Sequence, residues 1–318
     1  MKKWLIALLF ALVFVLAACG SDDASSDGGA EETESAEESD DAAEESDAGE
    51  ESSDDGVSDR IKELQESGVV IGFANEKPYA YEEDGELKGV AVDVATAVLN
   101  ELGIDNIEGH LSDFGELIPG LSANKFDIIT ASMAITPERC ENVAFGEPEV
   151  KYGEGLIVQA GNPLDLHSYK DIADNPDVTV SIMQGATEVG FVQEEGVDPS
   201  QIQEAPDIPA TLSAVESGRA DATTGTEMTI KLALESLGSD KLEFVEDFEQ
   251  PDIEGVPSYG AAAFRLDDDD LREAYNEKLA ELKETDRYGE LLEANYFSAT
   301  SNSVEAEVTT ERVCAGEF

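Results

Sequence analysis

From Val69 onward the chain alternates short apolar runs with segments of helical periodicity, and this alternation constrains the fold more than any other feature. Short apolar runs bounded by turn residues are typical of buried strands, whereas apolar residues three or four positions apart mark one face of a helix. Strands that alternate with helices predict an α/β protein. We expect strands at 69–74, 126–131, 178–183, 220–224 and 259–264.

Start and stop signals place the helices between these strands. Asp207 and Thr226 are typical N-caps, and Gly103 and Gly238 are typical helix stops. One further helix is expected after Gly185-Ala186-Thr187. The buried faces are expected to carry Ala91, Ala95, Val98 and Leu102, then Ile208, Leu212 and Val215, and finally Leu271, Tyr275 and Leu282.

This α/β pattern occurs twice within about 250 residues, which is more than one hydrophobic core usually organises. We therefore expect two lobes with a cleft between them. A single doubly wound domain is the alternative.

The N-terminus has the features of an export signal. Lys2 and Lys3 precede an apolar run at 4–15, and Leu-Ala-Ala-Cys follows at 16–19. A basic start, a short apolar segment and small residues before a cysteine predict a secretory signal that ends in a lipobox. We expect residues 1–19 to be a lipoprotein signal peptide, with Cys19 as the lipidated N-terminus that anchors the protein to the extracytoplasmic face of the cell membrane. An ordinary signal peptide that contains a cysteine is the alternative.

The segment after the signal is strongly acidic. Residues 21–59 hold 18 Asp and Glu, no Lys or Arg, and few apolar residues other than Ala. Such a segment cannot bury enough apolar surface to offset the entropy lost on ordering. We expect residues 20–59 to be a disordered acidic linker.

The remaining residues, 60–318, carry 55 acidic and 17 basic side chains. A negative charge of this size disfavours nucleic acid as a partner. His110 and His167 lack metal-ligand spacing, and the acidic run 267–270 lacks the glycine and the alternating spacing of a calcium loop. We expect no metal site and no cofactor.

Cys140 and Cys314 are the remaining cysteines. An oxidising compartment permits a disulfide between them. Two free thiols are the alternative, because the sequence does not show whether their Cα atoms lie within reach.

Several motifs carry a resemblance that covers about 68–297. They are the segments 72–81 (with Asn-Glu-Lys-Pro-Tyr), 89–103, 117–121, 126–129, 135–140 (Ile-Thr-Pro-Glu-Arg-Cys), 161–164 and 166–169. In these segments the chain resembles the family 3 solute-binding proteins of ABC importers, and within that family the ectoine and hydroxyectoine binding proteins.

The resemblance implies a type II periplasmic-binding-protein fold, which is an α/β fold with two lobes, a ligand cleft and a two-strand hinge. Lobe one would comprise 60–158 plus 259–318, and lobe two 159–258. It also implies a monomer that captures a small molecule, an ectoine-like zwitterion, and delivers it to the permease and ATPase subunits of the importer without doing chemistry.

Arg139 is the first candidate ligand-binding residue. Thr136 and Pro137 predict a helix start, and an Arg in the first turn, where the helix dipole disfavours a cation, favours an anionic partner. Its fork suits a ligand carboxylate, and an ion pair with a nearby acid is the alternative. Gly185 and Thr187 are expected to hold the same carboxylate from the other lobe, with plain helix capping as the alternative.

The resemblance implies the remaining site residues. Thr226 replaces the Asp that binds the ammonium in relatives specific for amino acids, which favours a delocalised cation such as a cyclic amidinium. Glu76 would pair with that cation, with a solvated surface acid as the alternative. Tyr79 and Phe114 would stack on it, with core packing as the alternative. Ala134 is a departure, because the ectoine proteins have a third aromatic ring there. Either a neighbour such as Tyr81, Tyr152 or Tyr259 replaces that ring, or the pocket holds a larger ligand.

Two other functions remain open at this point. A dehydratase-like enzyme on this fold would need a general acid or base, for which Glu76 is the candidate. A sensor domain would need a signalling partner instead of a permease. Among transport ligands, a polar or basic amino acid is the alternative to an ectoine.

The acidic charge of residues 60–318 predicts a dependence of stability on salt. At molar salt the Debye length is only about 3 Å, so repulsion between surface carboxylates is largely screened. We infer a high-salt habitat and expect the melting temperature to rise between low and molar NaCl. A flat response would contradict this inference.

Overall fold

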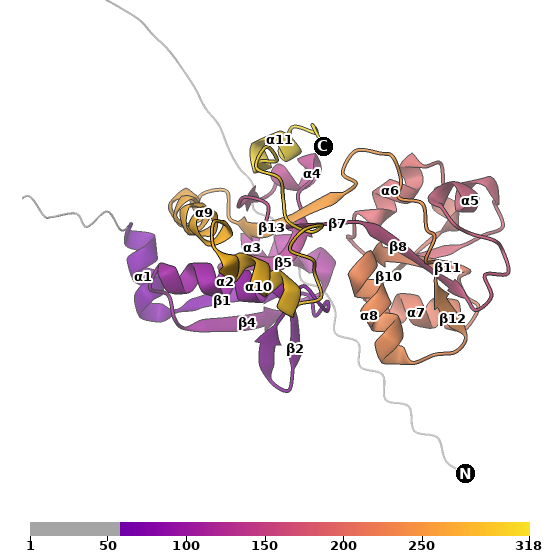
Figure 1. Cartoon of the computed structure of the whole chain (residues 1–318), viewed down its shortest axis with the longest axis horizontal. Helices are drawn as coiled ribbons and strands as arrows, with labels where there is room; N and C mark the ends of the chain where they lie inside the picture. The colour runs from indigo at the N-terminus through magenta and orange to yellow at the C-terminus, as the bar shows by residue number, and fades with distance from the viewer. Residues whose placement is uncertain (1–57) are drawn as a thin grey trace, which may run out of the picture. The chain divides into compact units, whose positions relative to one another are not determined.

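The computed structural model describes residues 58–318 as an α/β protein with two separate sheets (Figure 1). The predicted signal peptide with Cys19 lies outside the described residues, as does nearly all of the predicted acidic linker. The first helix, α1 (Asp59–Ser67), begins at the last residue assigned to that linker. Ser58 caps α1 by accepting a hydrogen bond from the Ile61 amide.

The first sheet has the strand order β4-β1-β5-β13-β6, with β7 also paired to β13. Strands β1, β4 and β5 are mutually parallel, and β13 runs antiparallel to β5, β6 and β7. The strands are β1 (Val69–Phe73), β4 (Ile107–Leu111), β5 (Ile128–Ala134), β6 (Ala144–Phe145), β7 (Val150–Tyr152) and β13 (Ser258–Phe264). A separate hairpin pairs β2 (Tyr81–Glu83) with β3 (Glu86–Lys88).

Helices cover both faces of the first sheet, which explains why its central strands are buried along their whole length. On one face, Ile128 and Phe264 pack with α1, α2 (Val90–Glu101), α9 (Asp269–Lys283) and α10 (Asp286–Ala294). On the other face, Ile129 and Ala263 pack with α3 (Leu117–Ser122) and α11 (Thr310–Cys314). Figure 1 shows α2, α9 and α10 gathered on the same face.

The second sheet has the order β10-β9-β11-β8-β12. Strands β9, β10 and β11 are parallel, and β8 runs antiparallel to β11 and β12. The strands are β8 (Glu154–Gln159), β9 (Val180–Met183), β10 (Ile202–Ala205), β11 (Ala222–Thr226) and β12 (Leu242–Phe244). The helices that cover its two faces are α5 (Tyr169–Asp174) and α6 (Glu188–Glu194) on one, and α7 (Ile208–Glu216) and α8 (Glu227–Leu237) on the other.

Two segments connect the sheets. Gly153 alone separates β7 from β8, and residues 245–257 lead from β12 back to β13. The Gln250 side chain joins the two segments, because its Oε1 accepts from the Glu154 amide (2.8 Å) and its Nε2 donates to the Glu154 carbonyl (2.7 Å). The lobe boundary predicted between residues 158 and 159 lies near the end of β8, and β8 pairs only with strands of the second sheet.

Each predicted helix and strand is present in the structure, but the first or last residues of several differ from the predicted ones. β5 runs to Ala134 instead of ending at 131, and β11 runs to Thr226 instead of ending at 224. Asp207 caps α7 as predicted, whereas Thr226 precedes α8 without a capping hydrogen bond from its side chain. Sequence reasoning missed the remaining elements, which are α1, the β2–β3 hairpin, β4, α3, β6, β7, β8, α5, β10, β12, α10 and α11.

Candidate ligand-binding site

The candidate site is a pocket to which both sheets contribute. The carboxyl ends of the parallel strands β1, β4 and β5 in the first sheet, and of β9, β10 and β11 in the second, lead into the loops that line it. Ligand sites in α/β proteins commonly occupy this position, because loops from several strands converge there.

The pocket encloses about 40 Å³ of space that the centre of a water molecule can occupy. It adjoins a larger cavity of about 730 Å³ by the same measure, and the two share Arg139, Ala186 and Thr187. The smaller pocket is lined by Glu76, Tyr79, Phe114, Ala131, Ser132, Ala134, Arg139, Tyr152, Met183, Ala186, Thr187, Glu188, Ile208, Thr224, Gly225 and Thr226.

Arg139 lies in α4 (Pro137–Cys140), directly after β5. As the sequence predicts, Thr136 caps this short helix by accepting from the Arg139 amide (3.2 Å), with Pro137 in the first position. The guanidinium donates from Nη1 to the Ala134 carbonyl (2.8 Å) and from Nη2 to the Gly185 carbonyl (2.9 Å). It therefore contacts β5 of the first sheet and the turn after β9 of the second.

Glu76 lies in the loop after β1, where its backbone forms an isolated bridge with Ala80. Its Oε1 is buried and has no hydrogen-bond partner among residues 58–318. Burial and the carboxylate of Glu188 raise the pKa of Glu76 to about 8, while Arg139 opposes the shift. Glu76 as a whole is half-buried, and its buried Oε1 distinguishes it from a fully solvated surface acid.

Three aromatic rings, those of Tyr79, Phe114 and Tyr152, line the pocket. Tyr79 is 2% exposed and meets Tyr152 edge to face, with ring centroids 5.1 Å apart. Phe114 lies beneath the Arg139 guanidinium at 5.5 Å. Of the three tyrosines considered as substitutes for the missing ring at Ala134, only Tyr152 lines this pocket.

The candidate ligand-binding residues of the second lobe do not all line the small pocket. Thr187 lines the pocket, and its side chain makes no capping hydrogen bond to α6. Thr226 also lines the pocket, with its hydroxyl bonded to Thr229 (3.2 Å). Gly185 lines the larger cavity instead. It lies so close to Gly115 of the first lobe that a Cβ at Gly185 would be 2.8 Å from the Gly115 Cα.

Sequence reasoning missed three polar residues of the pocket, namely Ser132, Glu188 and Thr224. Ser132 is buried within β5, has φ 45° and has no partner for its hydroxyl among residues 58–318. A serine within a mostly apolar strand, which also contains Thr130, was its one signal in the sequence. Glu188 is 4% exposed, and nothing in the sequence distinguished it from the other 72 acids.

Glu154 lies behind Glu188 and is 1% exposed. Its carboxylate oxygens have no hydrogen-bond partner among the described residues. Burial, together with the charge of Glu188, holds the pKa of Glu154 well above its usual range. A proton on Glu154 would relieve the repulsion between these two carboxylates.

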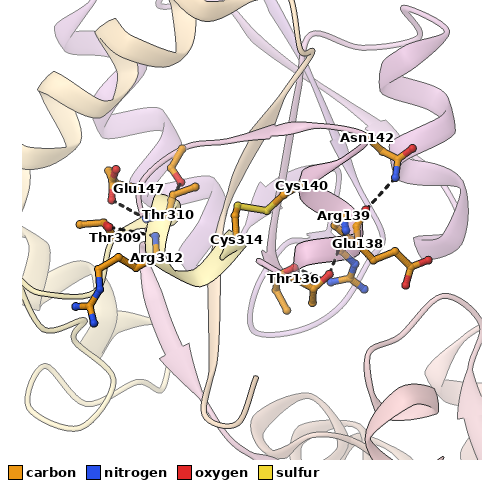
Figure 2. Close-up of a disulfide and its surroundings, with 12 residues drawn as sticks. Thr136, Glu138, Arg139, Cys140, Asn142, Glu147, Thr309, Thr310, Arg312 and Cys314 are labelled. Carbon is orange, nitrogen blue, oxygen red and sulfur yellow. Dashed lines mark hydrogen bonds between the residues drawn. A yellow bond between two sulfur atoms is a disulfide. The ribbon is translucent and has the colours of Figure 1, made fainter. Parts of the chain in front are cut away.

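Cys140 and Cys314 form a disulfide with a Cα–Cα distance of 5.9 Å (Figure 2). The sequence left open whether these two cysteines are bridged or free, and the structure contains the disulfide. Within residues 58–318 no group of histidine, cysteine or acidic residues has the geometry to hold a metal ion, and no helix is long and apolar enough to cross a membrane.

The fold and this site define a solute-binding protein. The family model of bacterial extracellular solute-binding proteins, family 3, matches residues 69–299, and the chain belongs to that family. The predicted type II periplasmic-binding-protein fold is thereby confirmed.

Individual relatives are similar over most of the chain. The probable amino-acid ABC transporter periplasmic-binding protein y4tE of Sinorhizobium fredii is 39% identical over 261 residues, which cover 80% of this chain and 86% of the relative. The crystal structure of EhuB in complex with hydroxyectoine is 34% identical with a TM-score of 0.73, and the match covers 80% of this chain and 97% of EhuB.

A third similarity bears on the enzyme alternative. The ancestral amino acid-binding protein AncCDT-1, a precursor of cyclohexadienyl dehydratase, is 26% identical with a TM-score of 0.63, over 74% of this chain and 99% of that protein. The chain is therefore similar to binding proteins, one of which is the precursor of an enzyme.

Proposed function

We propose that the protein is the extracytoplasmic receptor of an ABC importer and binds ectoine or hydroxyectoine. One observation carries the proposal: Arg139, Glu76 and three aromatic rings line the same small pocket. A cation, an anion and π faces in one pocket suit a small zwitterion with a delocalised positive charge. The similarity to EhuB in complex with hydroxyectoine supports the same ligand class.

In this proposal Arg139 and Thr187 bind the ligand carboxylate, and Glu76 pairs with the ring nitrogens. Tyr79 and Phe114 stack on the ring, and Tyr152 takes the place of the aromatic residue missing at Ala134. The unpartnered Glu76 Oε1 and Tyr79 hydroxyl support this assignment. A buried polar atom without a partner costs about 1–3 kcal/mol, which a ligand donor or acceptor would offset.

The closed pocket is small for such a solute, so we propose that ligand enters when the lobes separate. The Arg139 to Gly185 hydrogen bond joins the two sides and would be exchanged for bonds to the ligand. Exchange of this kind gives the ligand a differential affinity for one arrangement of the lobes, which is what closure around a ligand requires.

A polar or basic amino acid is the second candidate, and Glu188 favours it. The absence of an acid at Thr226 argues against an ammonium ligand, but the structure places the Glu188 carboxylate in the same pocket. A primary ammonium therefore has an alternative partner. The similarity to a probable amino-acid binding protein supports this candidate too.

We propose that the mature protein is held at the membrane by a lipid on Cys19 and works with the permease and ATPase subunits. The Leu-Ala-Ala-Cys sequence supports the anchor. The full-length protein should partition into the detergent phase after export, and Cys19→Ala should leave it in the aqueous phase. Aqueous partitioning of the unmutated exported protein would contradict the anchor.

Calorimetric titration of residues 57–318 with ectoine, hydroxyectoine, glycine betaine, arginine and glutamine tests the function. We expect micromolar binding of an ectoine, with the solute recovered unchanged after incubation. Arg139→Ala should weaken that binding at least about 100-fold, since two charge-assisted hydrogen bonds are lost. The exposed Arg287 provides the matched control, and Arg287→Ala should bind normally.

Binding of an amino acid alone would contradict the ectoine assignment and retain the receptor function. Conversion of the solute would contradict the receptor function. Full affinity of folded Arg139→Ala would contradict the carboxylate assignment.

The pKa of Glu76 predicts a pH dependence of binding. Below about pH 8 the free Glu76 is largely protonated, and a ligand cation needs the carboxylate form. The affinity should therefore rise from pH 6 to about pH 8, approaching tenfold per pH unit, and level off above it, with a proton released on binding at pH 7. Titration in buffers of different ionisation enthalpy measures that proton.

Glu76→Gln should bind weakly and without this pH dependence, whereas the exposed Glu82→Gln should behave like the unmutated protein. A flat affinity between pH 6 and pH 8 in the unmutated protein would contradict the pairing of Glu76 with a cation.

A further inference from the structure

The C-terminal tail, residues 310–318, links the helix that carries Arg139 to one of the two segments that connect the sheets. Helix α4 has only four residues, Pro137–Cys140. A helix this short has little stability of its own and depends on tertiary contacts. The disulfide from Cys140 to Cys314 attaches it to the tail directly after Arg139 (Figure 2).

The tail is itself fastened to the first lobe near the disulfide. Thr309 caps α11 by accepting from the Arg312 amide, and the Thr310 hydroxyl donates to the Gly146 carbonyl (2.5 Å). Val313 is buried in the core beneath α3 and β5. The disulfide therefore joins α4 to a segment that cannot shift freely.

The other end of the tail contacts the connecting segment 251–257, which is the last part of the stretch 245–257 that leads from β12 to β13. The carbonyl of Phe318 accepts a hydrogen bond from the Gly255 amide (3.0 Å). Gly316, with φ 72°, lies so close to Glu254 that a Cβ there would be 2.5 Å from the Glu254 Oε1.

Contacts within the tail hold its two ends together. Arg312 donates from Nε to Glu317 (2.6 Å), and its guanidinium lies 4.4 Å from the centre of the Phe318 ring. The Phe318 ring also meets Tyr259 of β13 edge to face at 5.9 Å. The tail is thus folded back on itself and held against the first sheet.

The same tail lines the cavity next to the ligand pocket. Val313 and Phe318 form part of the 730 Å³ cavity that Arg139 and Thr187 also line, and Phe191 of α6 is among the residues lining that cavity. Movement of the tail would therefore change the surroundings of Arg139 and the connection between the lobes together.

We propose that the tail is a strap, held by the Cys140–Cys314 disulfide, that positions Arg139 and restrains the connecting segment 251–257. Retention of the bound ligand then depends on the disulfide and on the last three residues. The proposal rests on the proposed function in one respect, because it takes Arg139 as the residue that holds the ligand.

Two variants of the chain 57–318 separate the two ends of the strap. Cys140→Ser with Cys314→Ser removes the disulfide, and deletion of 316–318 removes the contact with Gly255 while keeping the disulfide. Glu311→Gln changes an exposed residue of α11 and serves as the control. Dissociation of hydroxyectoine and of L-arginine is measured well below the unfolding temperature, where a loss of stability alone leaves the rate unchanged.

We expect at least fivefold faster dissociation in both variants and no change in Glu311→Gln. Hydrogen exchange of the ligand-free proteins gives a readout that does not need a ligand: amides of 137–143 and 251–257 should exchange faster together in the disulfide-free variant. If neither solute binds, the proposed function fails while the exchange data still test the strap. Unchanged dissociation in either variant, or unchanged exchange at 251–257, would overturn the strap.

Discussion

The guanidinium of Arg139 is the interaction on which the site depends, because it donates to a carbonyl of each lobe. Arg139 is half-buried, and a cation partly withdrawn from water is costly unless its donors are satisfied and opposite charge lies nearby. Ala134 and Gly185 supply the acceptors, and Glu188 supplies charge, as does Glu76 when it is ionised. The cap of α4 and the disulfide next to it keep this group at the pocket.

The acidic side chains of the site outnumber its cationic side chain, Arg139. Glu76 and Glu188 line the pocket with Arg139, and Glu154 lies directly behind them. The raised pKa values of Glu76 and Glu154 follow from burial next to a like charge. A positive ligand group would favour the ionised form of these acids, so the pocket suits ligands that bring one, as both an ectoine and a basic amino acid do. The charged groups of the pocket thus constrain the proposed ligand class more than the volume of the pocket does.

Local signals in the sequence predicted the site residues whose chemistry is unusual for their position. An Arg in the first turn of a helix, after Thr-Pro, indicated an anion-binding role, and the structure places Arg139 at the pocket. Glu188 and Glu154 carry no such signal, because each is one acid among 73. Their significance comes from burial at the meeting point of distant strands. Tyr152 was one of three tyrosines named as possible replacements for the ring missing at Ala134, and only the structure shows which of the three lines the pocket.

The sequence by itself determined the alternation of strands and helices, since periodicity and capping are local properties of the chain. It also indicated that Arg139 suits an anionic partner, since its position in the first turn of a helix is a local property too. The tertiary structure decided which strands pair, where the chain crosses between the sheets, and that Cys140 and Cys314 lie 5.9 Å apart after a separation of 174 residues. These features depend on contacts between distant segments, whose register and distance no local pattern records.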